Sequence, residues 1–474
     1  MSTRTNSYHG ALNRTVQLWK SPNCNYWGIK ALKLEFLLRG CLKLAWRLLI
    51  CLSIFVVLAD MVFASLYNVI LISIPHNLIL ALYTFLSLGF VVIFWGILIL
   101  TRRSPIEVKG SFMRISQILT WLLQTILSIF VIFLFLEVLY NAEYTQAVSS
   151  YAQFSGILGG IFLLTILLRQ LIYSFKKFRT KILFLFTLSI VSTLSYLVIL
   201  LTLTYLVIPD KPVTITQSWL MTHVYLPTDS IEWRLSKIVP YFQNVSFLTL
   251  WIASGFLFRY HFKKKRPVVF IILLLTPAVY FLGRVVDISY LTGYLITLIG
   301  GTNVTESVIR IVIRTVSPLI GGIIFGLSFY YSSRSLPTDS KLRIYLNITG
   351  HGLIILLVSS QYGVIFQYPY PPLGTIALSA TYLGAYLILV GIYSTAVSSA
   401  QNLKIHNEIS RIIRERSKLS HEMGSAIFIE SIEKQISKFE IGIETESGVE
   451  SVPDEKEIRK YIEEVLSEKR KPRN

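Results

Sequence analysis

The stretch LLICLSIFVVLADMVFASLYNVILISI occupies residues 48–74 and contains one charged residue, Asp60. A helix needs roughly 20 apolar residues to cross a hydrocarbon core of about 30 Å, so this run is long enough to span a membrane. It follows a basic segment and precedes no small-residue cleavage site, which excludes a cleavable signal peptide. We therefore predict that 48–74 is a transmembrane helix.

Comparable apolar runs recur along the whole chain, which has 474 residues, 53% of them hydrophobic and only 15% charged. A soluble domain carries about 25% charged residues, so this composition excludes a soluble enzyme, a nucleic-acid-binding domain, a disordered chain and a disulfide scaffold. The predicted fold class is all-α: a polytopic helical membrane bundle of about ten transmembrane helices with a cytoplasmic helical tail. The ten predicted spans are 48–74, 78–100, 115–140, 152–175, 182–208, 244–262, 267–283, 307–332, 344–366 and 374–398.

The net charge of +19 is distributed unevenly over the connections between these spans. The N-terminal segment and every second connection hold 24 Lys and Arg residues, whereas the alternate connections hold four. Positive residues collect on the cytoplasmic side of membrane proteins. We therefore predict a multi-pass protein of the cytoplasmic membrane with both termini in the cytoplasm. The basic inner face would contact anionic lipid, and no nucleic-acid partner is expected.

Three regions follow from this reading. Residues 1–47 form a basic cytoplasmic segment whose end, 30–47, has the pattern of an interfacial amphipathic helix. Residues 48–400 form the transmembrane bundle. Residues 401–474 form a charged cytoplasmic tail with two predicted helices, the second of which begins near Ser451 and has one apolar face. A lone helix of that length is marginal in water, so it should pack on the bundle, on the other tail helix or on a cytoplasmic protein partner.

The segment 284–306 is the weakest point of the predicted topology. It contains VVDISYLTGYLITLIGG, which is apolar but short and ends in two glycines. A full span there would invert every later segment and remove the charge bias. We predict a re-entrant or interfacial helix on the outer side.

A few charged residues lie in or beside the apolar runs, where a charge costs at least about 2.5 kcal/mol. Asp60 could titrate with proton flux, bind a cation, or pair with an arginine in a purely structural role. Glu137 and Arg169 lie near the ends of their spans and are expected to extend towards the interfaces. The candidates for an ion or substrate pathway are Asp60, Arg284, Asp287, Glu306, Arg310 and Arg314, the last three sharing one helix face at spacings of four.

Two glycine pairs, Gly156/Gly160 and Gly322/Gly326, have the GxxxG spacing that allows helices to approach closely. Pro318 lies just before the second pair and could break that helix beside the arginines. A broken helix at a charged midplane is a device of transporters, and ordinary tight packing is the alternative.

The sequence contains no metal-ligand cluster, nucleophile elbow or phosphate-binding lysine motif. We therefore predict no catalytic residue, no metal and no cofactor, and we expect that the protein is not an enzyme. Cys24, Cys41 and Cys51 match no metal or redox spacing and are read as free thiols.

Three strings in the last third of the chain resemble an uncharacterised family of polytopic membrane proteins of ammonia-oxidising (thaumarchaeal) archaea. They are SPLIGGIIFGLSFY (317–330), PYPPLGTIALSATYLG (369–384) and YLILVGIYSTAVSSAQNLKI (386–405), and the tail string EIRKYIEEVL (457–466) adds to them. The resemblance implies an archaeal cytoplasmic membrane and a bundle of about ten spans with an inner tail. It implies no activity and no site residue.

Two functions remain open at this point. The span count and the intramembrane charges favour a carrier for a small solute or ion. The long charged tail favours a membrane sensor or scaffold that signals through a cytoplasmic partner. A lipid-processing enzyme would be a third reading, but the sequence has no motif for it.

Overall fold

The computed structural model describes most of the bundle. The described residues are 48–65, 75–103, 111–208, 212–214, 230–261, 267–285, 303–334, 336, 341–366 and 369–416. The predicted interfacial helix at 30–47, most of the predicted re-entrant segment and the second tail helix lie outside them, as do Asp287 and the tail beyond Arg416.

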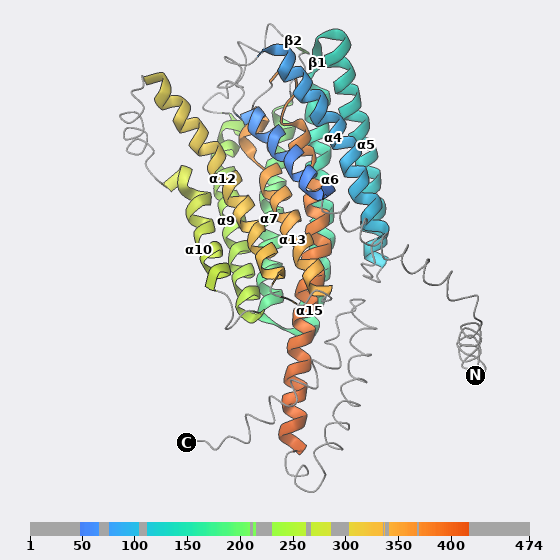
Figure 1. Cartoon of the computed structure of the whole chain (residues 1–474), viewed down its shortest axis with the longest axis vertical. Coiled ribbons are helices and arrows are strands. Elements are labelled where there is room, and N and C mark those ends of the chain that lie inside the picture. Colours follow the sequence, from blue (N-terminus) through green and yellow to red (C-terminus); the bar gives the residue numbers. More distant parts are fainter. Residues whose placement is uncertain are drawn as a thin grey trace, which may run out of the picture.

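The described chain is almost entirely helical (Figure 1). This is expected for apolar segments, because a helix satisfies its own backbone hydrogen bonds where lipid offers none. A helix Leu48–Ser65 comes first. The remaining elements are α4 (His76–Arg103), α5 (Ser111–Asn141), β1 (Glu143–Thr145), α6 (Gln146–Phe178), α7 (Lys181–Leu206), β2 (Pro212–Thr214), α9 (Ile231–His261), α10 (Pro267–Val285), α12 (Asn303–Ser333), α13 (Lys341–Ser359), the 3-10 helix η1 (Tyr362–Phe366), α14 (Thr375–Ser379) and α15 (Thr381–Arg416).

Eight helices in the described part of the chain are long and apolar enough to cross a membrane. Their outer faces expose large hydrophobic side chains; on α4, for example, Phe85, Leu88 and Val92 are all more than half exposed. A soluble bundle would bury such residues, whereas a bilayer covers them. The described chain therefore has the architecture of a multi-pass membrane protein. The eight spans are Leu48–Ser65, Asn77–Ile99, Phe112–Asn141, Gln146–Phe178, Lys181–Leu206, Val316–Ser333, Leu342–Ser359 and Thr375–Gln401.

The predicted spans 244–262 and 267–283 coincide with α9 and α10, which pack into the same bundle. Within the described residues, neither helix has a window that is both long and apolar enough to count among the eight, and α10 contributes only the shorter apolar stretch Ile271–Phe281. The number ten therefore stays a prediction.

The helix in the predicted span 344–366 ends earlier than predicted. Helix α13 stops at Ser359, and η1 follows as a 3-10 helix. The polar run Ser359–Ser360–Gln361 lies at this point, and the backbone N–H and the hydroxyl of Ser360 both donate to the carbonyl of Leu356. Side-chain bonds of this kind compete with regular helical continuation.

Helix α15 is the centre of the bundle, and the span Thr375–Gln401 is completely buried. It packs against α13, α6, α5 and α7. Its contact with α13 depends on glycine: a Cβ at Gly384 would lie 2.7 Å from the backbone nitrogen of Leu356. Small residues let membrane helices approach to backbone contact, which explains how the middle helix is enclosed.

Three connections meet at one end of the bundle. Strands β1 and β2 pair antiparallel, with Glu143 opposite Thr214, and so join the chain after α5 to the chain after α7 (Figure 1). The Tyr370 hydroxyl donates to the carbonyl of Val138 at 3.2 Å, which brings the segment before α14 to the same end. All three connections belong to the set with few basic residues, so the described bundle has the alternation that the charge count predicted.

Candidate functional site: a buried carboxylate beside an interrupted helix

Asp60 lies in the helix Leu48–Ser65 and is fully buried. Its Oδ2 atom accepts a hydrogen bond of 2.8 Å from the backbone N–H of Ala377, in α14. The backbone amides of Gly374 and Ile376 also lie near the carboxylate. The partner of this carboxylate is therefore the start of a helix. No described arginine or lysine side chain forms an ion pair with it, and the predicted pairing with an arginine is not seen there.

The local sequence explains why a helix begins at this point. Gly374 precedes α14 and has φ 89°, a left-handed conformation that glycine adopts without strain. The first amides of a helix have no partner within the helix and carry the positive end of its dipole. A carboxylate from another span fits this place in both hydrogen bonding and charge.

The predicted span 374–398 is not one regular helix. α14 ends at Ser379, and α15 begins at Thr381 after a turn at Ala380. Pro318, where a break was considered, lies inside the continuous helix α12. The interruption thus occurs in the last span, beside Asp60, whereas the Pro-Pro-Leu-Gly run that ends at Gly374 marks the start of α14.

Close packing from α6 holds this interruption in place. A Cβ at Gly156 would lie 2.5 Å from the Cα of Ser379, and Gly160 faces Thr381. The hydroxyls of Ser149 and Thr375 form a hydrogen bond of 2.5 Å. The GxxxG pair of α6 therefore packs tightly, as its spacing predicted. The pair in α12 does the same against α13, with Gly326 facing Ile354 and Gly350.

The second carboxylate oxygen of Asp60 has no hydrogen-bond partner among the described residues. Oδ1 is buried and makes no hydrogen bond with any described residue. The Oγ atom of Ser379 is also buried and has no partner in the described part of the chain. Buried polar atoms are almost always bonded, so an open carboxylate oxygen inside a membrane protein marks a place where a proton or a ligand could bind.

One further titratable side chain, Tyr83, lies near Asp60. Tyr83 of α4 is 1% exposed and lies within electrostatic reach of Asp60, Glu137 and Tyr370. Tyr370 stacks on Tyr144, the middle residue of β1. Tyr83 therefore lies between Asp60 and the end of the bundle that holds Glu137, β1 and β2.

Glu137 was expected to extend towards the interface, and the structure shows a more specific role. Its Oε2 accepts from the backbone N–H of Thr145 at 3.0 Å, and its Oε1 accepts from the Thr145 hydroxyl at 2.8 Å. Thr145 is the residue before α6. Glu137 is thus a second carboxylate at the start of a helix. Sequence reasoning missed this partner because it comes from the turn after α5.

A second set of polar side chains connects α4, α5 and α15. The Tyr382 hydroxyl donates to Oε1 of Gln124, and Nε2 of Gln124 donates to Ser128 at 3.1 Å. The Trp95 indole N–H donates to the same Ser128 hydroxyl at 3.2 Å. Gln124 therefore bonds between α5 and α15. Gln361 accepts from Gln243 of α9 at 3.2 Å.

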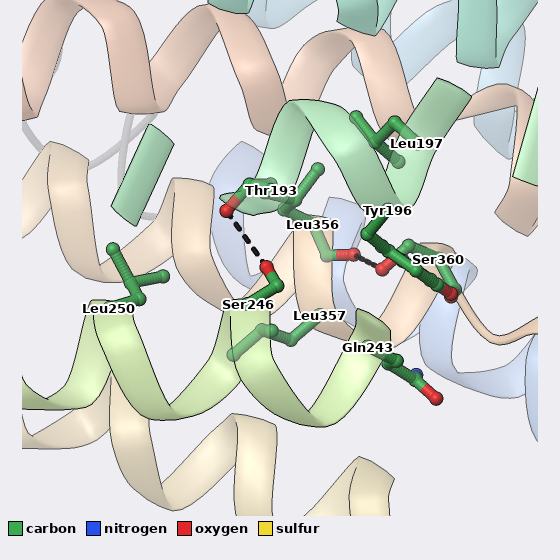
Figure 2. A pocket seen from close by; sticks show the side chains of 9 residues that line it. All are labelled: Thr193, Tyr196, Leu197, Gln243, Ser246, Leu250, Leu356, Leu357 and Ser360. Atoms are coloured by element: carbon green, nitrogen blue, oxygen red, sulfur yellow. Dashed lines mark hydrogen bonds between the residues drawn. The ribbon is translucent and has the colours of Figure 1, made fainter. Parts of the chain in front are cut away.

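A small cavity lies between α7, α9 and α13 (Figure 2). The hydroxyls of Thr193 and Ser246 pair across it at 2.8 Å, and Tyr196 donates to the carbonyl of Ser360. The cavity has room for about one water molecule. It does not include Asp60, so it is separate from the carboxylate site.

The other predicted site residues are placed only in part. Arg284 lies in the last turn of α10 rather than in the connection after it. Glu306, Arg310 and Arg314 lie on α12, as their spacing predicted, but their side chains fall outside the described part of the structure, as does the whole of Asp287. That these charges share one pathway with Asp60 therefore stays a prediction. The described side chains include no group of three or more His, Cys, Asp or Glu that could hold a metal ion.

Comparison with known proteins adds no relative to this picture. The chain matches no family model, no curated protein and no solved structure. The resemblance of its last third to a thaumarchaeal family accordingly stays a prediction, and the function must be argued from the site itself.

Proposed function

We propose that this protein is a carrier for a small solute or ion and that the site around Asp60 belongs to its pathway. The observation that carries the proposal is the open Oδ1 atom of a fully buried carboxylate beside an interrupted helix. Carriers bind their ions and solutes near the middle of the membrane, where interrupted helices present backbone groups and helix ends to the ligand.

The energetics of Asp60 support the same function. A charged carboxylate at this depth costs at least about 2.5 kcal/mol, and the amides of α14 offset part of that cost for the ionised form. Because burial disfavours the ionised carboxylate and the α14 amides favour it, the two protonation states can lie close in free energy. Binding of a proton or a ligand can then change the state of Asp60.

The wider setting of the proposal is the topology predicted from charge. The carrier would have ten spans, place both termini in the cytoplasm and lie in the cell membrane with anionic lipid at its inner face. The end of the bundle with β1, β2 and the segment before α14 would then face outward.

The first test is a melting-temperature screen of the purified protein. The panel holds monovalent and divalent ions, amino acids, organic acids and ammonium compounds. A ligand at about 100 times its dissociation constant should stabilise by roughly 2.7 kcal/mol. We expect at least one compound to raise the melting temperature of the wild type, and Asp60→Asn to lose that shift. Flux of the same compound into proteoliposomes would then establish transport.

Asp60→Asn needs two controls. Arg314→Gln asks whether the arginine face of α12 belongs to the same site. Thr202→Val removes a hydroxyl from α7 that bonds only to its own helix and is a neutral reference. A well-folded protein that responds to no compound would contradict the carrier.

The alternative is a sensor or scaffold that signals through the tail, and α15 gives it a structural basis. This helix runs without interruption from Thr381 in the buried core to Arg416, beyond the rest of the described bundle (Figure 1). A change at α14 could therefore move the start of the tail. Truncation after Arg416 would test it: a sensor loses a cytoplasmic partner and keeps a folded bundle, whereas a carrier keeps its flux.

A further inference from the structure

We infer that α10 is a jointed helix and that Trp251 of α9 is the latch that holds the joint at Pro277 closed. The inference goes beyond the proposed function, because it identifies a moving part of the bundle whatever the solute is. It begins from a backbone hydrogen bond that the sequence of α10 makes impossible.

Pro277 lies inside α10, and a proline has no backbone N–H. The carbonyl of Leu273, four residues before it, therefore lacks the partner that a regular helix supplies. Inside a bilayer no water replaces that partner, and an unpaired carbonyl is costly. A group from outside α10 has to bond this carbonyl if the helix is to keep its shape at the proline.

Trp251 supplies that group. It lies on α9, is half-buried, and its indole N–H donates to the carbonyl of Leu273 at 2.7 Å. The packing of the two helices is loose at this level: a Cβ at Gly255, one turn further along α9, would lie 3.7 Å from the nearest atom of Leu273. A single side-chain hydrogen bond from α9 therefore takes the place of the missing backbone bond.

The part of α10 beyond the proline is anchored more firmly. Tyr280 is fully buried, and its ring stacks on Phe247 of α9 with the ring centroids 3.7 Å apart and the planes at 9°. The hydroxyl of Ser317, on α12, donates to the carbonyl of Val279 at 2.5 Å. A Cβ at Gly321 of α12 would lie 2.6 Å from the Cα of Tyr280, so the two backbones are in contact. Both α9 and α12 thus hold this part of α10 in place.

The part of α10 before the proline is the part that moves. Ile271, Leu274 and Leu275 are all more than half exposed, so they face lipid rather than another helix. Opening of the Trp251 bond lets this part turn about Pro277 while the part beyond stays packed, as in hinges where a few residues absorb the change. In the orientation predicted from charge, α10 begins at the cytoplasmic side, so the moving part would be its inner half.

Distance measurements by double electron–electron resonance on the full chain in lipid nanodiscs test the inference. With the native cysteines replaced by serine, spin labels are placed at Leu274→Cys and, on α7, at Val198→Cys, both exposed positions. We expect one main distance and a minor second one. Trp251→Phe keeps an aromatic ring but has no N–H. It should raise the share of the second distance about threefold, because a hydrogen bond between membrane helices contributes about 0.6 kcal/mol on average.

Three further variants make the test specific. Pro277→Ala restores an N–H to the helix and should leave a single distance, with or without Trp251→Phe. Trp121→Phe, which alters an indole on α5, should keep the wild-type distances. A label at Ala278→Cys in place of Leu274→Cys lies just beyond the joint and should report a single distance in every protein.

Three results would overturn the inference. Unchanged distances in Trp251→Phe would show that the indole bond holds nothing closed. A second distance that persists in Pro277→Ala would place the movement elsewhere than at the proline. Equal changes at Leu274 and Ala278 would mean that α10 moves as one rigid helix. Should Trp251→Phe fail to fold, the wild type against Pro277→Ala decides: a single distance in both would exclude the joint.

Discussion

Asp60 and Ala377 are separated by 317 residues, and a hydrogen bond of 2.8 Å joins the carboxylate of the first to the backbone N–H of the second. The bond connects the first described span to the last. It also places the negative group at the positive end of α14, where its charge is stabilised most. The bond therefore holds together two spans that lie far apart in the sequence.

The first prediction concerns the strength of this connection. Asp60→Leu leaves the Ala377 N–H buried without an acceptor and should lower the free energy of unfolding by about 1–3 kcal/mol. Asp60→Asn keeps one carbonyl oxygen and should lose less. Thermal unfolding in nanodiscs measures both. A leucine variant as stable as the wild type would show that the N–H finds another acceptor and that the bond is dispensable.

The sequence was sufficient for the features that depend on composition. The apolar runs predicted helices at all ten positions where the described part of the structure has long ones, and the charge count predicted which connections share an end of the bundle. Asp60 stood out because one acid in an apolar run is costly wherever the fold places it.

Partners chosen by tertiary packing could not be predicted. Nothing local to Asp60 indicates Ala377, and nothing local to Glu137 indicates that Thr145 turns back onto it. The interruption of the last span was also missed. Its residues Thr375–Gln401 are apolar enough for one helix, and the packing of Gly156 on Ser379 is a contact between distant segments.

The second prediction tests that packing. In Gly156→Ala the new Cβ would lie 2.5 Å from backbone atoms of Ser379, so α14 would have to move. We expect a loss of about 1–3 kcal/mol in unfolding free energy. In Gly255→Ala the nearest atom is 3.7 Å away, and alanine favours the helix, so this control should be neutral or slightly stabilising. Similar losses in both variants would mean that the cost is not steric.

The third prediction concerns the bond between Tyr382 and Gln124, deep in the bundle. A double-mutant cycle of Tyr382→Phe and Gln124→Leu should give a coupling energy of about 0.6 kcal/mol and at most about 1.7 kcal/mol, the average and the maximum found for hydrogen bonds between membrane helices. Unfolding of the four proteins in one detergent supplies the four free energies. A cycle of Tyr382→Phe with Thr125→Val is the control, because Thr125 bonds only to its own helix. Equal coupling in both cycles would assign the effect to general loosening.

The fourth prediction concerns orientation, which follows from the charge bias. Asn141 and Lys176 are both exposed and lie at opposite ends of the segment that contains α6. That helix is about 50 Å long at a rise of 1.5 Å per residue, enough to cross a bilayer. With the three native cysteines replaced by serine, Asn141→Cys should react with a membrane-impermeant maleimide in intact cells. Lys176→Cys should react only after permeabilisation, because the charge bias predicts that its end of α6 faces the cytoplasm.

Each other labelling pattern has a definite meaning. The reverse pattern would place both termini outside and would show that the basic connections do not set the orientation. Labelling of both positions in intact cells would mean that α6 does not cross the membrane, and the alternation inferred from β1 and β2 would then fail with it.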